Sequence, residues 1–142
     1  MNWLQKICPI LIGLYSLIYM PKATADTLDK EVSSFISGEG TVLYLGTGVA
    51  LPLLIDGKEG RQKSLRTLDS LGTSTLLCIG LKQITQVKRP DSDSRDSFPS
   101  CHATAAFAVA TMQSHYHPDT AILWYSGASL IAYSRLNLNR HR

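Results

Sequence analysis

Three short segments in the second half of the chain carry residues that could hold a multiply charged anion. The first contains Lys82 and Arg89, directly before Pro90. If a helix runs up to Pro90, the spacing of seven places both cations on one helix face, two turns apart. Arginine offers a bidentate fork and lysine a point charge, so the pair could bind one anion. The alternative is a solvated basic helix end, where cations also offset the helix dipole.

The second segment is Phe98-Pro99-Ser100-Cys101-His102-Ala103, at the junction of a polar loop and an alanine-rich stretch. We expect Ser100 to cap a helix whose free N–H groups and positive dipole end form an anion site. His102 would lie in the first turn beside the anion, placed to give a proton to a leaving group. A simple serine-capped helix with an incidental histidine is the alternative.

The third segment joins Ser134, Arg135 and His141 just after an apolar stretch. A basic tail after a helix end would explain these residues equally well when they are taken alone. Each of the three segments therefore has an ordinary explanation, and their order and joint spacing carry the functional hypothesis.

In that order the segments resemble the three-part signature of the type 2 phosphatidic acid phosphatase and vanadium haloperoxidase superfamily, K-x6-R-P, P-S-G-H and S-R-x5-H-x3-D. Lys82, Arg89 and Pro90 match the first part, while Pro99, Ser100 and His102 match the second. Ser134, Arg135 and His141 match the third part as far as the chain goes. The resemblance covers residues 82–142, and the region before Lys82 has no motif of its own.

The resemblance implies a metal-independent phosphatase that hydrolyses phosphomonoesters through a phosphohistidine. His141 would be the nucleophile and His102 the general acid. The phosphate pocket would consist of Lys82, Arg89, Ser100, the N–H of Cys101, and Arg135. The expected substrates are lipid phosphates, isoprenyl pyrophosphates or small soluble phosphoesters.

Two positions depart from the family pattern. Cys101 stands where glycine is usual, which is tolerable if its φ angle stays negative. The pattern also asks for an aspartate four residues after His141, whereas the sequence ends at Arg142. Such a carboxylate would orient the nucleophilic imidazole, as in a catalytic triad. We therefore expect a member that is truncated at its C-terminus, that lacks the family's final helix and whose activity is uncertain.

Two alternative functions stay open: a vanadate-dependent haloperoxidase, and a non-catalytic, exported anion-binding helical protein. A cysteine phosphatase is excluded, because the arginine it needs six residues after Cys101 is Phe107. The acidic run 91–96 resembles a calcium loop only slightly, since its sixth residue is Asp96 instead of glycine. We expect no metal and no cofactor, with vanadate as a phosphate mimic, because no zinc or paired-metal ligand spacing is present.

The elements that must position these residues are all expected to be helical. The sequence predicts an all-α fold, a bundle of about five short helices after a signal peptide. Ser37 to Gly40 should break the chain after the first helix, and one or two helices over 61–88 should break near Gly72. The expected helical segments are 26–36, 41–55 as a buried helix kinked or ended near Pro52, 61–88, 101–116, and 120–134 after a cap at Asp119 or Thr120.

The first 25 residues predict a secretory signal peptide. Lys6 precedes the uncharged stretch 7–20, and Ala23-Thr24-Ala25 forms a cleavage pattern. An uncleaved anchor is the alternative, although the stretch is short for a spanning helix. The domains are thus a signal peptide over 1–25 and an incomplete phosphatase-like helical domain over 26–142. The protein is expected to be exported, periplasmic or extracytoplasmic, with membrane association left open.

Composition excludes some partners. The 142 residues contain 14 Lys plus Arg against 11 Asp plus Glu, a net charge of +3, and the cations are spread along the chain. We therefore expect no nucleic-acid partner and instead a phosphate-containing small molecule or lipid. The mature chain would hold Cys78 and Cys101, which we expect to stay unpaired because Cys78 lies in an apolar helix interior and Cys101 within a site motif.

Overall fold

The computed structural model describes residues 22–141, and these residues form helices with no strand among them. The predicted all-α class is confirmed for this part of the chain. The chain divides into two compact units, Met1–Glu31 and Val32–Arg142. In the first unit only the beginning of helix α2 falls within the described residues. The predicted signal peptide, residues 1–25, lies outside them except for its last four residues.

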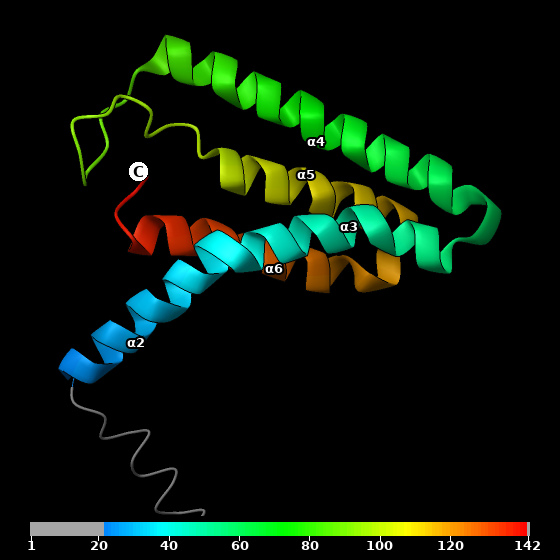
Figure 1. Ribbon diagram of the computed structural model, residues 1–142, viewed down its shortest axis with the longest axis horizontal. Helices are drawn as coiled ribbons and strands as arrows, with labels where there is room; N and C mark the ends of the chain where they lie inside the picture. Colours follow the sequence, from blue (N-terminus) through cyan, green and yellow to red (C-terminus); the bar gives the residue numbers. More distant parts are fainter. Residues whose placement is uncertain (1–21, 142) are drawn as a thin grey trace, which may run out of the picture. The chain divides into compact units, whose positions relative to one another are not determined.

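Five α-helices and two short helical turns follow one another in the described part of the chain. The turns are a π-helical turn, η1 (Ile36–Gly40), and a 3₁₀ turn, η2 (Pro118–Thr120). Within the second unit α3 to α6 run alternately up and down, so that consecutive helices are antiparallel (Figure 1). The α-helices are α2 (Lys22–Phe35), α3 (Thr41–Ile55), α4 (Gly57–Thr85), α5 (Cys101–Tyr116) and α6 (Ala121–Asn137).

Two predicted helix breaks do not occur. The segment from Ser37 to Gly40 adopts the π-helical turn η1 and leads directly into α3, where Thr41 Oγ1 donates to the Ile36 carbonyl at 2.8 Å. Gly72 lies inside α4, which is one unbroken helix of 29 residues. A glycine costs a helix only about 1 kcal/mol relative to alanine, so packing along the rest of the helix overrides it.

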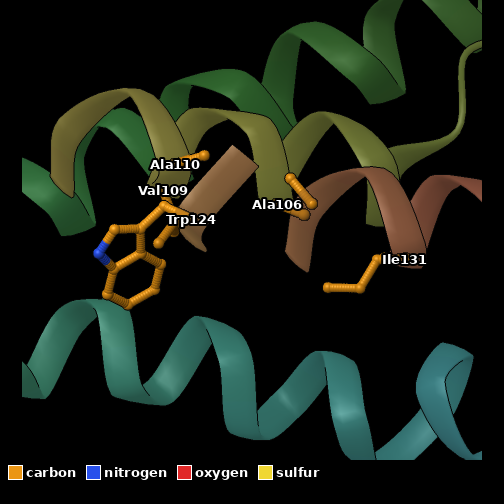
Figure 2. Close-up of a cluster of buried hydrophobic side chains, with 6 residues drawn as sticks. Ala106, Val109, Ala110, Trp124 and Ile131 are labelled. Atoms are coloured by element: carbon orange, nitrogen blue, oxygen red, sulfur yellow. The ribbon is translucent and has the colours of Figure 1, made fainter. Parts of the chain in front are cut away.

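The core of the second unit lies between α5 and α6 and faces α3. Figure 2 shows Trp124 and Ile131 of α6 directed toward α3, beside Ala106, Val109 and Ala110 of α5. The small alanine side chains on the buried face of α5 allow the neighbouring helices to approach its backbone closely. α5 packs against α3, α4 and α6 and is therefore the central helix of this unit.

Glycines mark the closest helix contacts. A Cβ atom added to Gly48 of α3 would fall 2.1 Å from Val109 Cγ1, and one added to Gly127 of α6 would fall 2.7 Å from the Tyr44 ring. Tyr44 fills the space above Gly127, and its hydroxyl donates to the Trp124 carbonyl at 2.7 Å. These contacts fix how α3 lies on α5 and α6.

The large aliphatic side chains of α3 are mostly exposed, contrary to the expected buried helix over 41–55. Its buried residues are Thr41, Gly48 and Pro52, whereas Leu54 is 80% exposed. The close approach of α3 to α5 requires small residues on the face of α3 that contacts α5, so the large aliphatic side chains of α3 lie on its other faces. The stretch Asp29–Ile55 is long and apolar enough to cross a membrane, and only 17% of its most apolar window is buried.

Candidate anion-binding site

The three predicted segments meet at one end of the second unit. The end of α4, the loop 86–100, the start of α5 and the end of α6 all lie there (Figure 1). Direct contacts join them: Lys82 and Arg89 reach Asp96 of the loop, and His141 reaches both Ser97 and Arg135. Residues that lie up to 59 positions apart, Lys82 and His141, thus belong to one cluster.

Lys82 and Arg89 converge, but not through a shared helix face. α4 ends at Thr85, because Gln86 adopts the left-handed conformation (φ 45°) and its N–H bonds the Lys82 carbonyl. The chain then turns back instead of running helically to Pro90. The loop is held by hydrogen bonds from the Arg89 N–H to the Ser94 carbonyl and from the Ser97 N–H to the Val87 carbonyl. This turn is what brings Arg89 beside Lys82.

Both cations bind one carboxylate, that of Asp96. Arg89 forms a two-pronged contact, with Nε 2.7 Å from Oδ1 and Nη2 2.7 Å from Oδ2. Lys82 Nζ lies 3.7 Å from Oδ2 and also donates to the Asp96 backbone carbonyl. Burial lowers the pKa of Lys82, an effect that Asp96 opposes and Arg89 reinforces. Burial acts to raise the pKa of Asp96, but Arg89 and Lys82 outweigh it and hold that pKa below its ordinary value.

The start of α5 presents the second segment. Ser100 occupies the N-cap position with an extended backbone, but its side chain makes no capping hydrogen bond, so the expected cap is wrong. Its Oγ is instead buried without a partner among the described residues. Cys101 begins the helix. Its φ angle is not positive, so a cysteine can stand at this position where the family pattern has glycine.

Cys101 forms a disulfide with Cys78 of α4, and the expectation of unpaired cysteines is therefore wrong. The two Cα atoms lie 5.6 Å apart, within the range that disulfides need. Because α4 and α5 run antiparallel, the interior of one helix meets the first residue of the other. The bond draws the Cys101 side chain toward α4 and leaves its backbone N–H at the open helix end.

Arg135 and His141 are both buried and in contact with each other. Arg135 is 5% and His141 6% exposed. Arg135 Nη1 donates to Ser37 Oγ at 2.6 Å, and its Nη2 lies 3.0 Å from His141 Nε2. Burial lowers the Arg135 pKa, and Arg140 and Arg89 lower it further. His141 Nδ1 donates to the Ser97 carbonyl at 2.5 Å, which orients the ring.

His102 lies in the first turn of α5, as predicted, with an exposed side chain. The protein groups around the ring partly desolvate it and lower the pKa of His102, and the charges of Arg135 and His141 lower this pKa further. Burial also lowers the pKa of His141, and Arg135 adds to the shift while the Ser97 hydrogen bond opposes it. Both imidazoles are therefore mainly neutral at pH 7. A bound dianion would raise both pKa values by offsetting the surrounding cations.

The sequence hypothesis missed three residues that complete the site. Asp96 was considered only as a member of a polar loop and as the sixth residue of a weakly calcium-like acidic run. Ser97 acts through its backbone, and Ser37 lies 98 residues before Arg135. Of these three residues, only Asp96 could have been found from the sequence, because its carboxylate lies between two prolines and close to Arg89 along the chain. Within residues 22–141, no group of three or more His, Cys, Asp or Glu residues could hold a metal ion.

Comparison with known proteins yields no relative: no protein-family model, no curated protein and no solved structure matches this chain.

Proposed function

We propose that the protein is a metal-independent phosphatase of the type 2 phosphatidic acid phosphatase superfamily that hydrolyses phosphomonoesters. The observation that supports this most is the convergence of His141, His102 and three cations at the open N-terminus of α5. Phosphoryl transfer chiefly needs in-line placement and charge stabilisation on the equatorial oxygens. Lys82, Arg89 and Arg135 with the Ser100–Cys101 helix start offer both without a metal.

The proposed first step uses His141 as the nucleophile. Its Nε2 lone pair forms a bond to phosphorus, the phosphorus–oxygen bond to the alcohol breaks, and protonated His102 gives its proton to the leaving oxygen. Neutral His102 then takes a proton from water, whose oxygen bonds to phosphorus as the phosphorus–nitrogen bond breaks. Inorganic phosphate leaves, and the electron pair returns to Nε2.

The contact between His141 and Ser97 supports that role. The resembling family uses a carboxylate to orient its nucleophile, and in this structure the Ser97 carbonyl accepts the Nδ1 hydrogen of His141. The unprotonated Nε2 then faces Arg135. A phosphate group bound by Arg135 would accept the hydrogen bond from Nη2, which would leave the Nε2 lone pair of His141 free for attack.

Two buried donors also support an anionic ligand. Ser100 Oγ and Arg135 Nε are buried without a hydrogen-bond partner among the described residues. Such groups are uncommon, because an unpaired buried donor costs about 1–3 kcal/mol. Phosphate oxygens would satisfy both, and vanadate would bind as a phosphate mimic.

The test is release of inorganic phosphate from p-nitrophenyl phosphate between pH 5 and 7. We expect His141→Ala to abolish turnover and His102→Ala to slow it by roughly 10²–10⁴-fold. His115→Ala is the matched control, because His115 is an exposed histidine in the last turn of the same helix as His102. Acid quenching should trap a phosphohistidine in the active protein. Full activity in His141→Ala would refute the mechanism, and phosphate binding without turnover would favour the non-catalytic anion-binding protein.

We further propose that the protein works outside the cytoplasm and associates with membranes. The disulfide supports an oxidising compartment, since such bonds seldom persist in the cytosol. The apolar helical stretch Asp29–Ile55 and the exposed aliphatic side chains of α3 support contact with lipid. Cell fractionation should find the protein in the membrane or periplasmic fraction, and N-terminal sequencing would establish whether the chain begins at Asp26.

A further inference from the structure

The carboxylate of Asp96 binds Lys82 and Arg89, the same two cations that a phosphate group would bind. Arg89 holds it with one hydrogen bond, from Nη2 to Oδ2 at 2.7 Å, and with an ion pair between Nε and Oδ1 at 2.7 Å. Arginine binds phosphate through the same nitrogen atoms. We propose that Asp96 is an internal competitor, whose carboxylate must leave Lys82 and Arg89 before a phosphate group binds. This inference rests on the proposed function and adds an autoinhibitory residue to that site.

The position of Asp96 suits a displaceable group. Its side chain is 41% exposed, whereas those of Lys82 and Arg89 are 15% and 25% exposed. It lies on the loop 86–100, whose backbone is held by the bonds Arg89 to Ser94 and Ser97 to Val87. The carboxylate can therefore rotate into solvent while the cations and the loop backbone stay in place.

The charge balance favours a dianion over the carboxylate. Asp96 carries one negative charge against two cations, and it does not reach Arg135, whose contacts are to the neutral groups Ser37 and His141. A phosphate dianion would bring a second charge and could also accept from Arg135 Nε and Ser100 Oγ, which have no hydrogen-bond partner within residues 22–141. A carboxylate ligand of equal charge would gain little over Asp96. The competitor would thus select doubly charged phosphoryl groups against singly charged anions.

The experiment is calorimetric titration of inorganic phosphate at pH 7 into the full chain and its variants. We expect Asp96→Asn to bind phosphate roughly tenfold more tightly than the wild type, because a charge-assisted contact no longer has to be broken. Asp93→Asn is the matched control: Asp93 lies on the same loop, is 98% exposed and pairs with Lys88 at 2.6 Å. It loses the same charge away from the site, so its affinity should stay within about twofold of the wild type.

Further variants keep the test decisive. Asp96→Ala should tighten phosphate binding like Asp96→Asn, and circular dichroism should show unchanged helix content for both. Lys82→Ala should weaken binding in either background. Equal or weaker binding in both Asp96 variants would overturn the inference and make Asp96 a positioning residue for the cations.

The inference and the proposed function can fail separately. If the Asp96 variants bind phosphate more tightly but no variant releases phosphate from an ester, internal competition stands and the hydrolytic function fails. If the wild type hydrolyses esters through His141 while the Asp96 variants bind phosphate no more tightly, the function stands and internal competition fails.

Discussion

At the residue scale, the hydrogen bonds of His141 determine which ring nitrogen is free to react. A carbonyl oxygen can only accept, so the contact between Nδ1 and the Ser97 carbonyl places the ring hydrogen on Nδ1. Nε2 then carries the lone pair that receives the Arg135 donor. Because burial and Arg135 lower the pKa of His141, the ring is mainly neutral at pH 7. The neutral Nδ1–H tautomer is the form that attack by Nε2 requires.

Nitrogen-15 NMR of labelled histidine tests this assignment. We expect the His141 signals at pH 7 to show a protonated Nδ1 and an unprotonated Nε2, and the titration midpoint to lie below 6.5, its ordinary value. Arg135→Gln should raise that midpoint, because it removes a cation that opposes protonation. A hydrogen on Nε2 at pH 7 would contradict the role of Ser97.

At the element scale, the distance between α3 and α5 depends on Gly48. Any side chain there would meet Val109 Cγ1, at 2.1 Å for a bare Cβ. The Gly48 carbonyl also accepts a hydrogen bond from the buried Gln113 side chain of α5. This close approach holds the start of α3, and the adjoining Ser37, beside α6.

Gly48→Ala should therefore lower the free energy of unfolding by about 1–3 kcal/mol, the usual cost of overpacking. Gly46→Ala is the matched control in the same helix, since a Cβ there would meet nothing within 4 Å. It should leave stability unchanged or raise it by up to about 1 kcal/mol through helix propensity. Urea unfolding measures both values, and equal effects of the two substitutions would contradict the described packing.

The sequence predicted local helices better than it predicted how they meet. The bounds of 41–55 and 101–116, and the place of His102 in a first helical turn, followed from local signals and are confirmed. The convergence of Lys82 and Arg89 was predicted for the wrong reason, since it depends on the left-handed Gln86, a residue with no turn signature. The disulfide could not be predicted because it requires the relative position of α4 and α5.

At the scale of the whole molecule, positive charge gathers at one end of the second unit. Arg135, Arg140 and Lys82 all act on His102, and Arg135, Lys82 and Arg89 act on His141. The net charge of the chain is only +3, so this concentration is a result of folding and is not visible in composition. The folded state consequently resists further protonation at this end.

Stability should therefore decrease on acidification. His102 and His141 have pKa values below 6.5 in the folded protein, so the unfolded chain binds more protons once the pH falls through about 6.5. The free energy of unfolding should fall between pH 7 and 5, before the carboxylates titrate. Urea unfolding across this range measures the slope, which a His102→Gln, His141→Gln double variant should flatten. A slope unchanged in that variant would show that other groups cause the loss.

The hydrogen bond between Arg135 and Ser37 also has a consequence for the order of folding. Consecutive antiparallel helices can form their contacts by local closure, but this bond joins residues 98 positions apart. Ordering so long a loop is slow, because its entropy must be lost before the contact forms. The contact between Arg135 and Ser37, next to His141, should thus be among the last parts to become protected in a refolding experiment. A chain competent to bind an anion would then be one that has finished folding.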